Sequence, residues 1–300
     1  MVVNPLVSIV IPIFNRLDLL KNTLLSIEGQ TFNSLEVLLI DDASETVFNI
    51  QELQDMLVGR SLRYHKLNKN QGPGKARSIG RALAKGQYVA YLDSDDEWEP
   101  TFLEETVAVL ETHDAVSMVF TNVLIKRKHS SQKRLALTTG NYDFFDLIFN
   151  KKLYWATGAA LWRSNISLAE NWKSFRDHED YVHDILSLLQ APQIYHLETP
   201  LCIVNKNDSL GIPRSNSDML KSLLLLSRSK QIIKNLSKEK KKDEFVSFIV
   251  WRLYKRNYKI KDLKRLILLY YILINYTDDF KLFTITFIRL IKRKLNYFKI

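Results

Sequence analysis

The chain has 300 residues, of which 46% are hydrophobic and 11% aromatic, and it carries a formal net charge of +10 at pH 7. This composition supplies a sizeable apolar core, which excludes an intrinsically disordered chain. The single cysteine, Cys202, excludes an internal disulfide, so the composition does not call for an oxidising compartment and a cytoplasmic setting is expected.

The first 125 residues alternate short apolar runs with helical stretches, which is typical of a parallel sheet covered by helices. Ligands of such sheets bind beyond the carboxyl ends of the strands. The polar residues at those ends are therefore the first candidates for a functional site. We expect strands at 7–13, 35–40, 62–66, 88–92 and 116–125, with helices at 17–27, 50–57, 74–84 and 101–110.

The remaining residues fall into two parts of different character. The pattern is irregular from about 140 to 210, with a helix expected at 179–189 and short strands near Ile194 and at 202–205. After Ser217 the chain contains neither Gly nor Pro and reads as helical. We therefore expect one domain over 1–216 and a basic helical region over 217–300.

Charge is distributed unevenly between these parts. Residues 1–220 hold 22 basic and 27 acidic side chains, whereas residues 221–300 hold 21 basic and 6 acidic ones, a net charge of +15. Basic, apolar and aromatic residues interleave in the tail, which favours amphipathic helices on an anionic membrane surface. The alternative is a helical bundle with a solvated basic face. No nucleic-acid motif accompanies the charge, and nucleic acid is not an expected partner.

The sequence predicts neither a signal peptide nor a membrane-spanning helix. The first apolar run contains Pro12 and lacks a preceding basic stretch. The longest apolar run, 266–275, is much shorter than the roughly 20 residues that a spanning helix needs. The expected location is the cytoplasm, peripheral at the inner face of the membrane.

Two acidic clusters follow apolar strands directly. The first is Asp41 and Asp42, and the second is Asp93, Asp95 and Asp96. Carboxylates this close raise each other's pKa unless a cation or several hydrogen-bond donors offset them, and a divalent cation that also binds phosphate is an economical explanation. The alternative is that these aspartates cap the helices that follow.

A glycine-rich turn leads into the helix expected at 74–84. The stretch NQGPGKARSIG at 70–80 carries Lys75 and Arg77, and such a turn can hold a phosphate at a helix start. It matches neither a P-loop nor a G-x-G-x-x-G fingerprint, and its glycines can equally serve only to shape the turn.

Five ordered motifs lie between residues 7 and 205. They are VSIVIPIFNR, SIEGQTFNSLEVLLIDDAS, NQGPGKARSIG, YLDSDDEW and HED at 178–180. Together they resemble the family 2 glycosyltransferases of GT-A fold. The resemblance implies a Rossmann-like, mostly parallel α/β sheet with flanking helices, a nucleotide-sugar half at 1–125 and an acceptor half at 126–216.

The resemblance also implies roles for residues that would bind the donor. Pro12, Phe14 and Asp42 would line the pocket of the nucleotide base, with Asp42 accepting a hydrogen bond from it. Arg77 would help to hold the donor, which is expected to be a UDP-linked sugar. The turn after Asp42 reads Ala43-Ser44-Glu45 where Gly-Ser-x-Asp is usual in the family.

The expected mechanism uses a bound metal ion and a general base. Asp93 and Asp95 match the family's Asp-x-Asp motif, and Asp95 would bind a divalent metal, Mn or Mg, that stabilises the departing diphosphate. Asp180, with Glu179 beside it, would take the proton of the acceptor hydroxyl, and a single displacement would invert the anomeric centre. The alternative is that these acidic residues only favour a helix N-terminus.

Two further positions bear on the acceptor and the metal. Trp155 lies where the family begins its acceptor-side wall, and an indole face suits a sugar ring, although Trp155 can equally be a core residue. Asn207 stands near the position where the family often places a metal- or diphosphate-binding His.

The sequence thus predicts an inverting, metal-dependent hexosyltransferase that moves a sugar to a glycan or lipid-linked acceptor in bacterial-type surface polysaccharide synthesis. One alternative is a sugar nucleotidyltransferase, but its Gly-rich loop directly after the first strand is absent. The other is a non-enzymatic, metal-binding receiver-like module, which would not use the residues beyond about 125.

Overall fold

A computed structural model of the chain describes residues 5–128, 130–134, 137–144, 146–147, 155–174, 179–189 and 191–206. All of these except Asp146 and Leu147 belong to one compact unit. The expected domain boundary at 216, the basic helical region 217–300 and Asn207 lie outside the described residues, so the predictions about them stay predictions.

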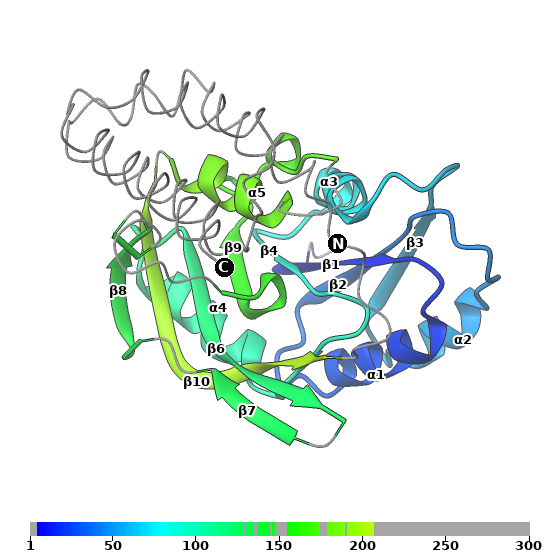
Figure 1. Ribbon diagram of the computed structural model, residues 1–300, viewed down its shortest axis with the longest axis horizontal. Coiled ribbons are helices and arrows are strands. Elements are labelled where there is room, and N and C mark those ends of the chain that lie inside the picture. Colours follow the sequence, from blue (N-terminus) through cyan, green and yellow to red (C-terminus); the bar gives the residue numbers. More distant parts are fainter. Residues whose placement is uncertain are drawn as a thin grey trace, which may run out of the picture. The chain divides into compact units, whose positions relative to one another are not determined.

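Ten strands of the described residues form one sheet, in the order β3-β2-β1-β4-β9-β6-β10-β5, with β7 paired to β6 and β8 to β10 (Figure 1). The strands are β1 Val7–Ile13, β2 Leu35–Asp41, β3 Ser61–Lys66, β4 Tyr88–Tyr91, β5 Glu97–Trp98, β6 Met118–Arg127, β7 Ser130–Arg134, β8 Gly140–Asp143, β9 Ala160–Arg163 and β10 Gln193–Asn205. The α-helices are α1 Leu17–Glu28, α2 Ile50–Asp55, α3 Pro73–Leu83, α4 Phe102–Thr112 and α5 Glu179–Leu188.

The first four strands of this order form the parallel sheet that the sequence predicts. β1 pairs in parallel with both β2 and β4, and β2 pairs in parallel with β3. Every residue of β1, β2 and β4 is buried except Pro12, which is half-buried. Their near-continuous apolar sequence is therefore explained by helices on both faces.

Beyond β4 the sheet is mixed, which differs from the mostly parallel arrangement that the sequence suggests. β9 lies antiparallel between β4 and β6, and β10 runs parallel to β6. The two short strands expected near Ile194 and Cys202 are one strand, β10, with register shifts on either side of Pro200. Proline cannot donate to the ladder, so the pairing is irregular there.

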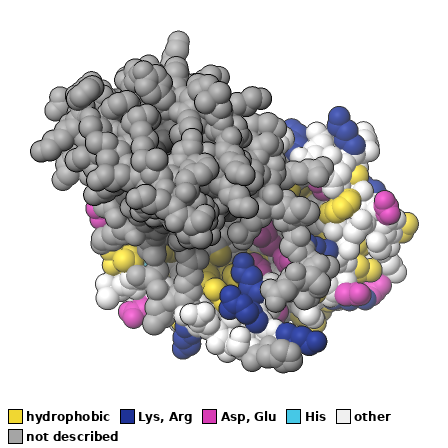
Figure 2. Space-filling view, viewed as in Figure 1, with side chains coloured by type: hydrophobic (Ala, Val, Ile, Leu, Met, Phe, Trp, Pro, Cys, Tyr) yellow, Lys and Arg dark blue, Asp and Glu magenta, His cyan; other side chains and the backbone are white. Residues whose placement is uncertain are grey.

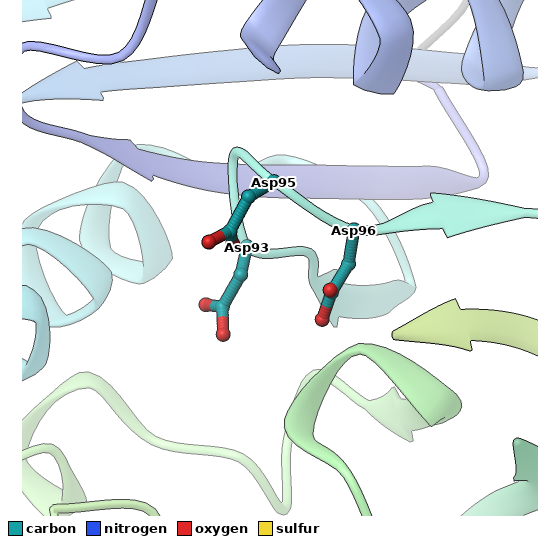
Figure 3. Close-up of side chains that lie close together, drawn as sticks. All are labelled: Asp93, Asp95 and Asp96. Carbon is teal, nitrogen blue, oxygen red and sulfur yellow. The ribbon is translucent and has the colours of Figure 1, made fainter. Parts of the chain in front are cut away.

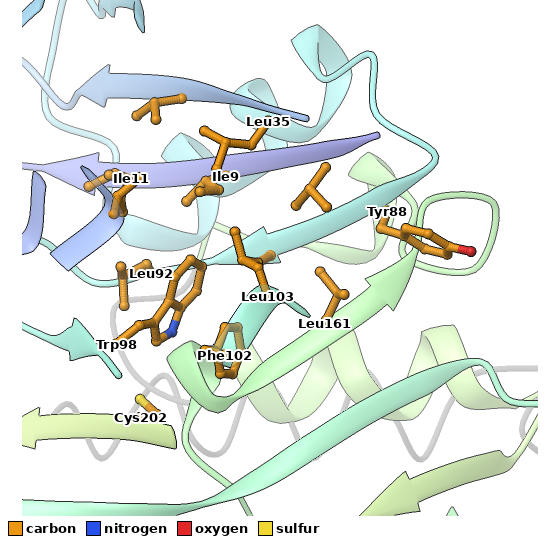
Figure 4. Packing of buried hydrophobic residues seen from close by; sticks show 14 of the residues in the cluster. Ile9, Ile11, Leu35, Tyr88, Leu92, Trp98, Phe102, Leu103, Leu161 and Cys202 are labelled. Atoms are coloured by element: carbon orange, nitrogen blue, oxygen red, sulfur yellow. The ribbon is translucent and has the colours of Figure 1, made fainter. Parts of the chain in front are cut away.

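Helices cover both faces of the sheet (Figure 1). The odd-numbered residues of β1 pack with buried residues of α1, α2 and α4 in one apolar cluster, part of which Figure 4 shows around Trp98, Phe102 and Leu92. On the opposite face α3 lies very close to the sheet. A Cβ on Gly80 would be 2.3 Å from Cγ1 of Val10, so only glycine permits this approach.

No described helix is long and apolar enough to cross a membrane. The described surface in Figure 2 carries basic and acidic side chains beside one another. This mixture agrees with the small excess of acidic residues over 1–220.

Candidate active site

Two loops at the carboxyl edge of the parallel strands are locked together. Asn15, after β1, and Ala43, after β2, have positive φ angles of 54° and 64°. The backbone N–H of Asn15 donates to Oγ of Ser44 at 2.9 Å, and Oδ1 of Asn15 accepts from the N–H of Glu45 at 2.9 Å. Asparagine tolerates the left-handed conformation because its side chain bonds the nearby backbone.

The two aspartates of the first acidic cluster have different partners. Asp41 is buried, and its Oδ2 accepts from the Tyr64 hydroxyl at 2.6 Å. The Asp42 carboxylate accepts from the N–H groups of Gln71, at 2.8 Å, and Gly72, at 2.7 Å. Asp42 therefore holds the glycine-rich turn against the sheet edge, and its predicted contact with a nucleotide base stays a prediction.

The other two residues expected near the base lie on the same edge. Pro12 is half-buried near the end of β1, and Phe14 directly after β1 is 43% exposed. An exposed aromatic ring beside Asp42's loop is available for stacking on a flat ligand.

The second acidic cluster forms a tight turn between β4 and β5. The ligand oxygens of Asp93, Asp95 and Asp96 lie within 4.8 Å of one another, and the N–H of Asp96 donates to the carbonyl of Asp93 at 3.0 Å. Figure 3 shows the carboxylates of Asp93 and Asp95 next to each other, with Asp96 farther along the turn. Three oxygen ligands in this space suit a hard divalent cation.

Basic and amide groups from distant elements contact each aspartate. Arg77 Nη2 lies 2.5 Å from Oδ1 of Asp93, and Arg16 Nη1 lies 2.6 Å from Oδ2 of Asp95. Oδ1 of Asp96 accepts from the backbone N–H of Asn205, at the end of β10, at 3.0 Å.

The electrostatics of this turn favour a bound cation. Burial raises the pKa of Asp95, and the neighbouring Asp93 adds to the rise while Arg16 opposes it. Burial, followed by the charges of Asp93 and Asp95, raises the pKa of Asp96 well above its usual value. A divalent cation would relieve this repulsion, so the residues fit the metal that the sequence suggests.

Arg77 of α3 connects the acidic turn to α5. Its guanidinium is buried and donates through Nη1 to Oε1 of Glu179 at 2.9 Å while Nη2 binds Asp93. Burial opposes the charge of Arg77, but Asp93 and Glu179 outweigh it and raise the pKa of Arg77. The guanidinium also lies over the Trp172 ring, 5.0 Å from its centroid.

Close packing at Gly74 of α3 brings Arg77 to Glu179. A Cβ on Gly74 would be 2.0 Å from the carbonyl oxygen of Lys173 and 3.0 Å from Cβ of Glu179. Only a residue without a side chain allows the two segments to approach so closely. Gly74 thus has a packing role beyond shaping the turn.

The two carboxylates expected to act on the acceptor lie in the first turn of α5. Glu179 is 7% exposed, and burial raises its pKa to about 7, although Arg77 opposes the rise and Asp180 adds to it. Asp180 is half-buried, and its Oδ1 accepts from the N–H of Tyr181 at 2.8 Å. Residue 178, the first of the HED motif, lies outside the described residues.

A buried network that sequence reasoning missed lies beneath Arg77. The His183 ring stacks on Trp172 at 4.0 Å, its Nε2 lies 2.8 Å from Oγ of Ser167, and its Nδ1 lies 2.7 Å from Oδ1 of Asp184. Burial, with the charges of Arg77 and Arg81, lowers the pKa of His183 well below 6.5. Ser167 and His183 are fully buried, and the His183 ring packs on Trp172, so this network supports the Trp172 ring that lies against Arg77.

Trp155 occupies a core position. It is 5% exposed, and its ring lies 4.9 Å from Phe120 and 5.9 Å from Phe144, centroid to centroid. This burial favours the core reading of Trp155, and its contact with an acceptor sugar stays a prediction.

Four residues that contact the site were not identified from the sequence, namely Arg16, Trp172, His183 and Asn205. Arg16 lies in the loop after β1 and Asn205 ends β10, so both positions near strand ends could have been considered. Trp172 and His183 are separated by ten residues and lie in segments whose pairing the periodicity does not specify.

Residues 8–167 match the family described as "Glycosyl transferase family 2". A Haemophilus influenzae protein named "Uncharacterized glycosyltransferase" is 32% identical over 148 residues, which cover 49% of this chain and 51% of that protein. The Campylobacter jejuni "GalNAc(5)-diNAcBac-PP-undecaprenol beta-1,3-glucosyltransferase" is 31% identical over 139 residues, covering 44% of this chain and 42% of the other.

An Escherichia coli protein, "UDP-Glc:alpha-D-GlcNAc-diphosphoundecaprenol beta-1,3-glucosyltransferase WfaP", is 32% identical over 124 residues, covering 41% of this chain and 47% of that protein. The matches thus span about half of these curated relatives or less. Their activities belong to those proteins as wholes.

The fold has close counterparts among solved structures. The crystal structure of S. aureus TarS 1-349 superposes with a TM-score of 0.69 at 18% identity, covering 87% of this chain and 76% of the other. Crystal structures of the same protein in complex with UDP and with UDP-GlcNAc give TM-scores of 0.68 and 0.69. With the family match over residues 8–167 and the α/β sheet that carries the acidic turn, the chain belongs to glycosyl transferase family 2 and has its GT-A fold.

Proposed function

We propose that this chain is an inverting, metal-dependent glycosyltransferase that moves a hexose from a UDP-linked donor to a hydroxyl of a glycan or lipid-linked acceptor in surface polysaccharide synthesis. The carrying observation is the Arg77 bridge, which joins Asp93 of the acidic turn to Glu179 beside Asp180. This link supports a single site in which the residues proposed to act on the donor and on the acceptor work together.

Names of related proteins support the substrate classes. The Campylobacter jejuni and Escherichia coli relatives are named for undecaprenol-linked acceptors, and the second is named for a UDP-Glc donor. UDP and UDP-GlcNAc are bound in the TarS structures. We carry the UDP-linked donor and the lipid-linked or glycan acceptor over to this chain as proposals.

Asp95 and Asp93 would hold the divalent cation, Mn or Mg, with Asp96 adjacent. When bound, the cation supplies positive charge that stabilises the departing nucleoside diphosphate, commonly by several kcal/mol. Arg77 orients Asp93 through its short ion pair, and Asn205 orients Asp96. Asp42 holds the glycine-rich turn, and the Phe14 ring and Pro12 would form a wall for the base.

Asp180 is the proposed general base. Glu179 is almost fully buried and its Oε1 binds Arg77, so it serves to position Arg77 and α5. Asp180 is more exposed and lies at the first turn of the same helix, where it can meet an acceptor hydroxyl. A base opposite the leaving group gives a single displacement with inversion at the anomeric carbon.

The basic tail, 221–300, is proposed to contact an anionic membrane surface, which would bring the enzyme to a lipid-linked acceptor at the inner face of the membrane. Its net charge of +15 is the supporting observation.

The deciding experiment measures nucleotide release and sugar transfer. The full chain is incubated with Mn²⁺ or Mg²⁺ and a panel of sugar nucleotides, with undecaprenyl-diphosphate-linked sugars as acceptors. The proposal expects nucleoside diphosphate release that depends on acceptor, and a product of inverted anomeric configuration by NMR. Release of pyrophosphate from a nucleoside triphosphate and a sugar phosphate would instead support a nucleotidyltransferase.

A further inference from the structure

Arg16, in the loop after β1, contacts the acidic turn formed by Asp93, Asp95 and Asp96. Its Nη1 is 2.6 Å from Oδ2 of Asp95, across 79 positions of sequence, and both side chains are 24% exposed. The charge that a cation would supply to Asp95 is therefore already supplied by a side chain of the protein itself.

The backbone beside Arg16 is held in place. The preceding residue, Asn15, is bonded through its N–H and its Oδ1 to the loop after β2. Arg16 therefore stays at the rim of the site, and only its side chain needs to move when Asp95 takes another partner. Because solvent reaches this side chain, its guanidinium can leave Asp95 without becoming a buried, uncompensated charge.

The second arginine of the site is placed differently. Arg77 is 4% exposed and is held from two sides by Asp93 and Glu179. Moving it would leave a buried carboxylate without its cation, which is costly. The two arginines thus differ in role: Arg77 is a fixed part of the site, and Arg16 is a replaceable counter-ion.

We propose that Arg16 is a built-in competitor of the divalent cation for Asp95, so that the cation binds tightly only together with a nucleoside diphosphate. This inference rests on the metal site of the proposed function. A cation that takes Asp95 leaves the guanidinium of Arg16 within a few ångströms of it, and like charges repel at that range. An incoming diphosphate supplies negative charge that neutralises both. Arg16 therefore opposes the cation alone and favours the cation with the diphosphate.

Thermodynamic linkage makes this effect measurable without any transfer reaction. If UDP tightens Mn²⁺ binding by some factor, Mn²⁺ must tighten UDP binding by the same factor. The proposal states that Arg16 contributes to that factor. A residue that served only to hold the loop would not change it in this direction.

The test titrates Mn²⁺ into the full chain with and without UDP, following free Mn²⁺ by electron paramagnetic resonance and heat by calorimetry. Arg16→Gln should bind Mn²⁺ alone about tenfold more tightly than the wild type, because the competing charge is gone. The gain in Mn²⁺ affinity on adding UDP should be smaller in Arg16→Gln than in the wild type. Arg16→Lys keeps the charge and should stay close to the wild type.

Two controls make the result specific. Lys21→Gln removes the same unit of charge from α1, where Lys21 pairs with Glu52 at 2.5 Å, and should leave Mn²⁺ binding unchanged. Asp95→Asn should weaken Mn²⁺ binding with and without UDP. Circular dichroism melting of each variant checks that the fold is retained.

The outcomes separate the two proposals. If Asp95→Asn weakens Mn²⁺ binding but Arg16→Gln binds Mn²⁺ alone no more tightly than the wild type, the competition is overturned and the metal site stands. If Mn²⁺ binding is indifferent to Asp95→Asn, the cation does not use Asp95, and the competition is overturned together with the metal-binding role of Asp95 in the proposed function.

Discussion

Arg77 on α3 and Glu179 on α5 form a buried ion pair, with 2.9 Å between Nη1 and Oε1, across 102 positions of sequence. The other terminal nitrogen of the same guanidinium binds Asp93 of the acidic turn. One side chain thus sets the position of the helix that carries the proposed base relative to the turn that would hold the metal. A small displacement of reacting groups can cost a large factor in rate, so we expect changes to this bridge to lower the rate of the proposed transfer.

Breaking the Arg77–Glu179 ion pair should lower the free energy of unfolding. At pH 8, Arg77→Met leaves the Glu179 carboxylate buried without its cation, and the free energy of unfolding should fall by about 3 kcal/mol. The double variant Arg77→Met/Glu179→Gln should lose clearly less than the sum of the two single variants, because it removes both charges. Urea unfolding of the wild type, the two single variants and the double variant gives the interaction free energy of the pair. Additive losses would show that the pair contributes no interaction of its own.

The assignment of the base predicts a split between binding and turnover. Asp180→Asn should leave UDP-sugar and Mn²⁺ affinity nearly unchanged and lower the transfer rate at least about a hundredfold, since only proton removal from the acceptor is lost. Glu179→Gln should cost less. Calorimetry of donor binding beside transfer rates measures both quantities. A dead Glu179→Gln beside a near-normal Asp180→Asn would move the base to Glu179.

Metal removal tests the acidic turn. A chelator should abolish transfer, and added Mn²⁺ should restore it. Asp95→Ala should eliminate turnover and metal-dependent donor binding while the melting curve stays near that of the wild type, because the Asp95 side chain is partly exposed. Asp93→Ala should also be severe. Full activity in chelator, with no bound metal found by elemental analysis, would contradict the prediction.

His183 predicts a pH dependence of stability. Its folded-state pKa lies well below 6.5. A depressed histidine pKa gives stability that is present above pH 6.5 and is lost as the pH falls below it, by up to about 1.4 kcal/mol per pH unit. His183→Asn lacks this proton, so its deficit relative to the wild type should shrink from pH 7 to pH 5.

Comparing His183→Asn with the wild type also cancels the effect of a second titrating group, Glu179. Glu179 has a folded-state pKa raised to about 7, so its contribution is present below pH 4.5 and is lost as the pH rises toward 7. That opposite trend occurs in both proteins and cancels in their difference. His65→Asn, at an exposed histidine of β3, is the matched control. A His183→Asn deficit that is constant with pH would mean that the histidine charges as readily in the folded protein as in the unfolded one.

The tail predicts salt-sensitive membrane binding. The full chain should bind vesicles that contain anionic phosphatidylglycerol at low salt and release them as salt rises, because surface attraction is screened over about 10 Å at 0.1 M. Neutral phosphatidylcholine vesicles are the control, and a chain ending at Ser217 should not bind either. Cosedimentation measures the bound fraction. If the full chain ignores anionic vesicles at low salt, the basic tail has another role.

Much of the fold of residues 1–125 was predictable because its elements are local. Continuous apolar runs specify β1, β2 and β4, and the structure confirms them to within one or two residues. The helix of Glu179 was also expected, and α5 covers Glu179–Leu188. The short strands β5, β7, β8 and β9 were missed, since runs of two to five residues pair through contacts far apart in the chain and have little periodicity of their own.

The sequence by itself determined the family, the parallel strands of residues 1–125 and the identity of the acidic residues that follow them, because buried strands must be apolar and the carboxylates at their ends stand out. Only the tertiary structure decided which charges meet. The pairing of Arg16 with Asp95 and of Arg77 with both Asp93 and Glu179 depends on loops and helices brought together by the sheet. The same holds for the burial of Trp155, because an indole has the same sequence signature in a core as in a sugar site.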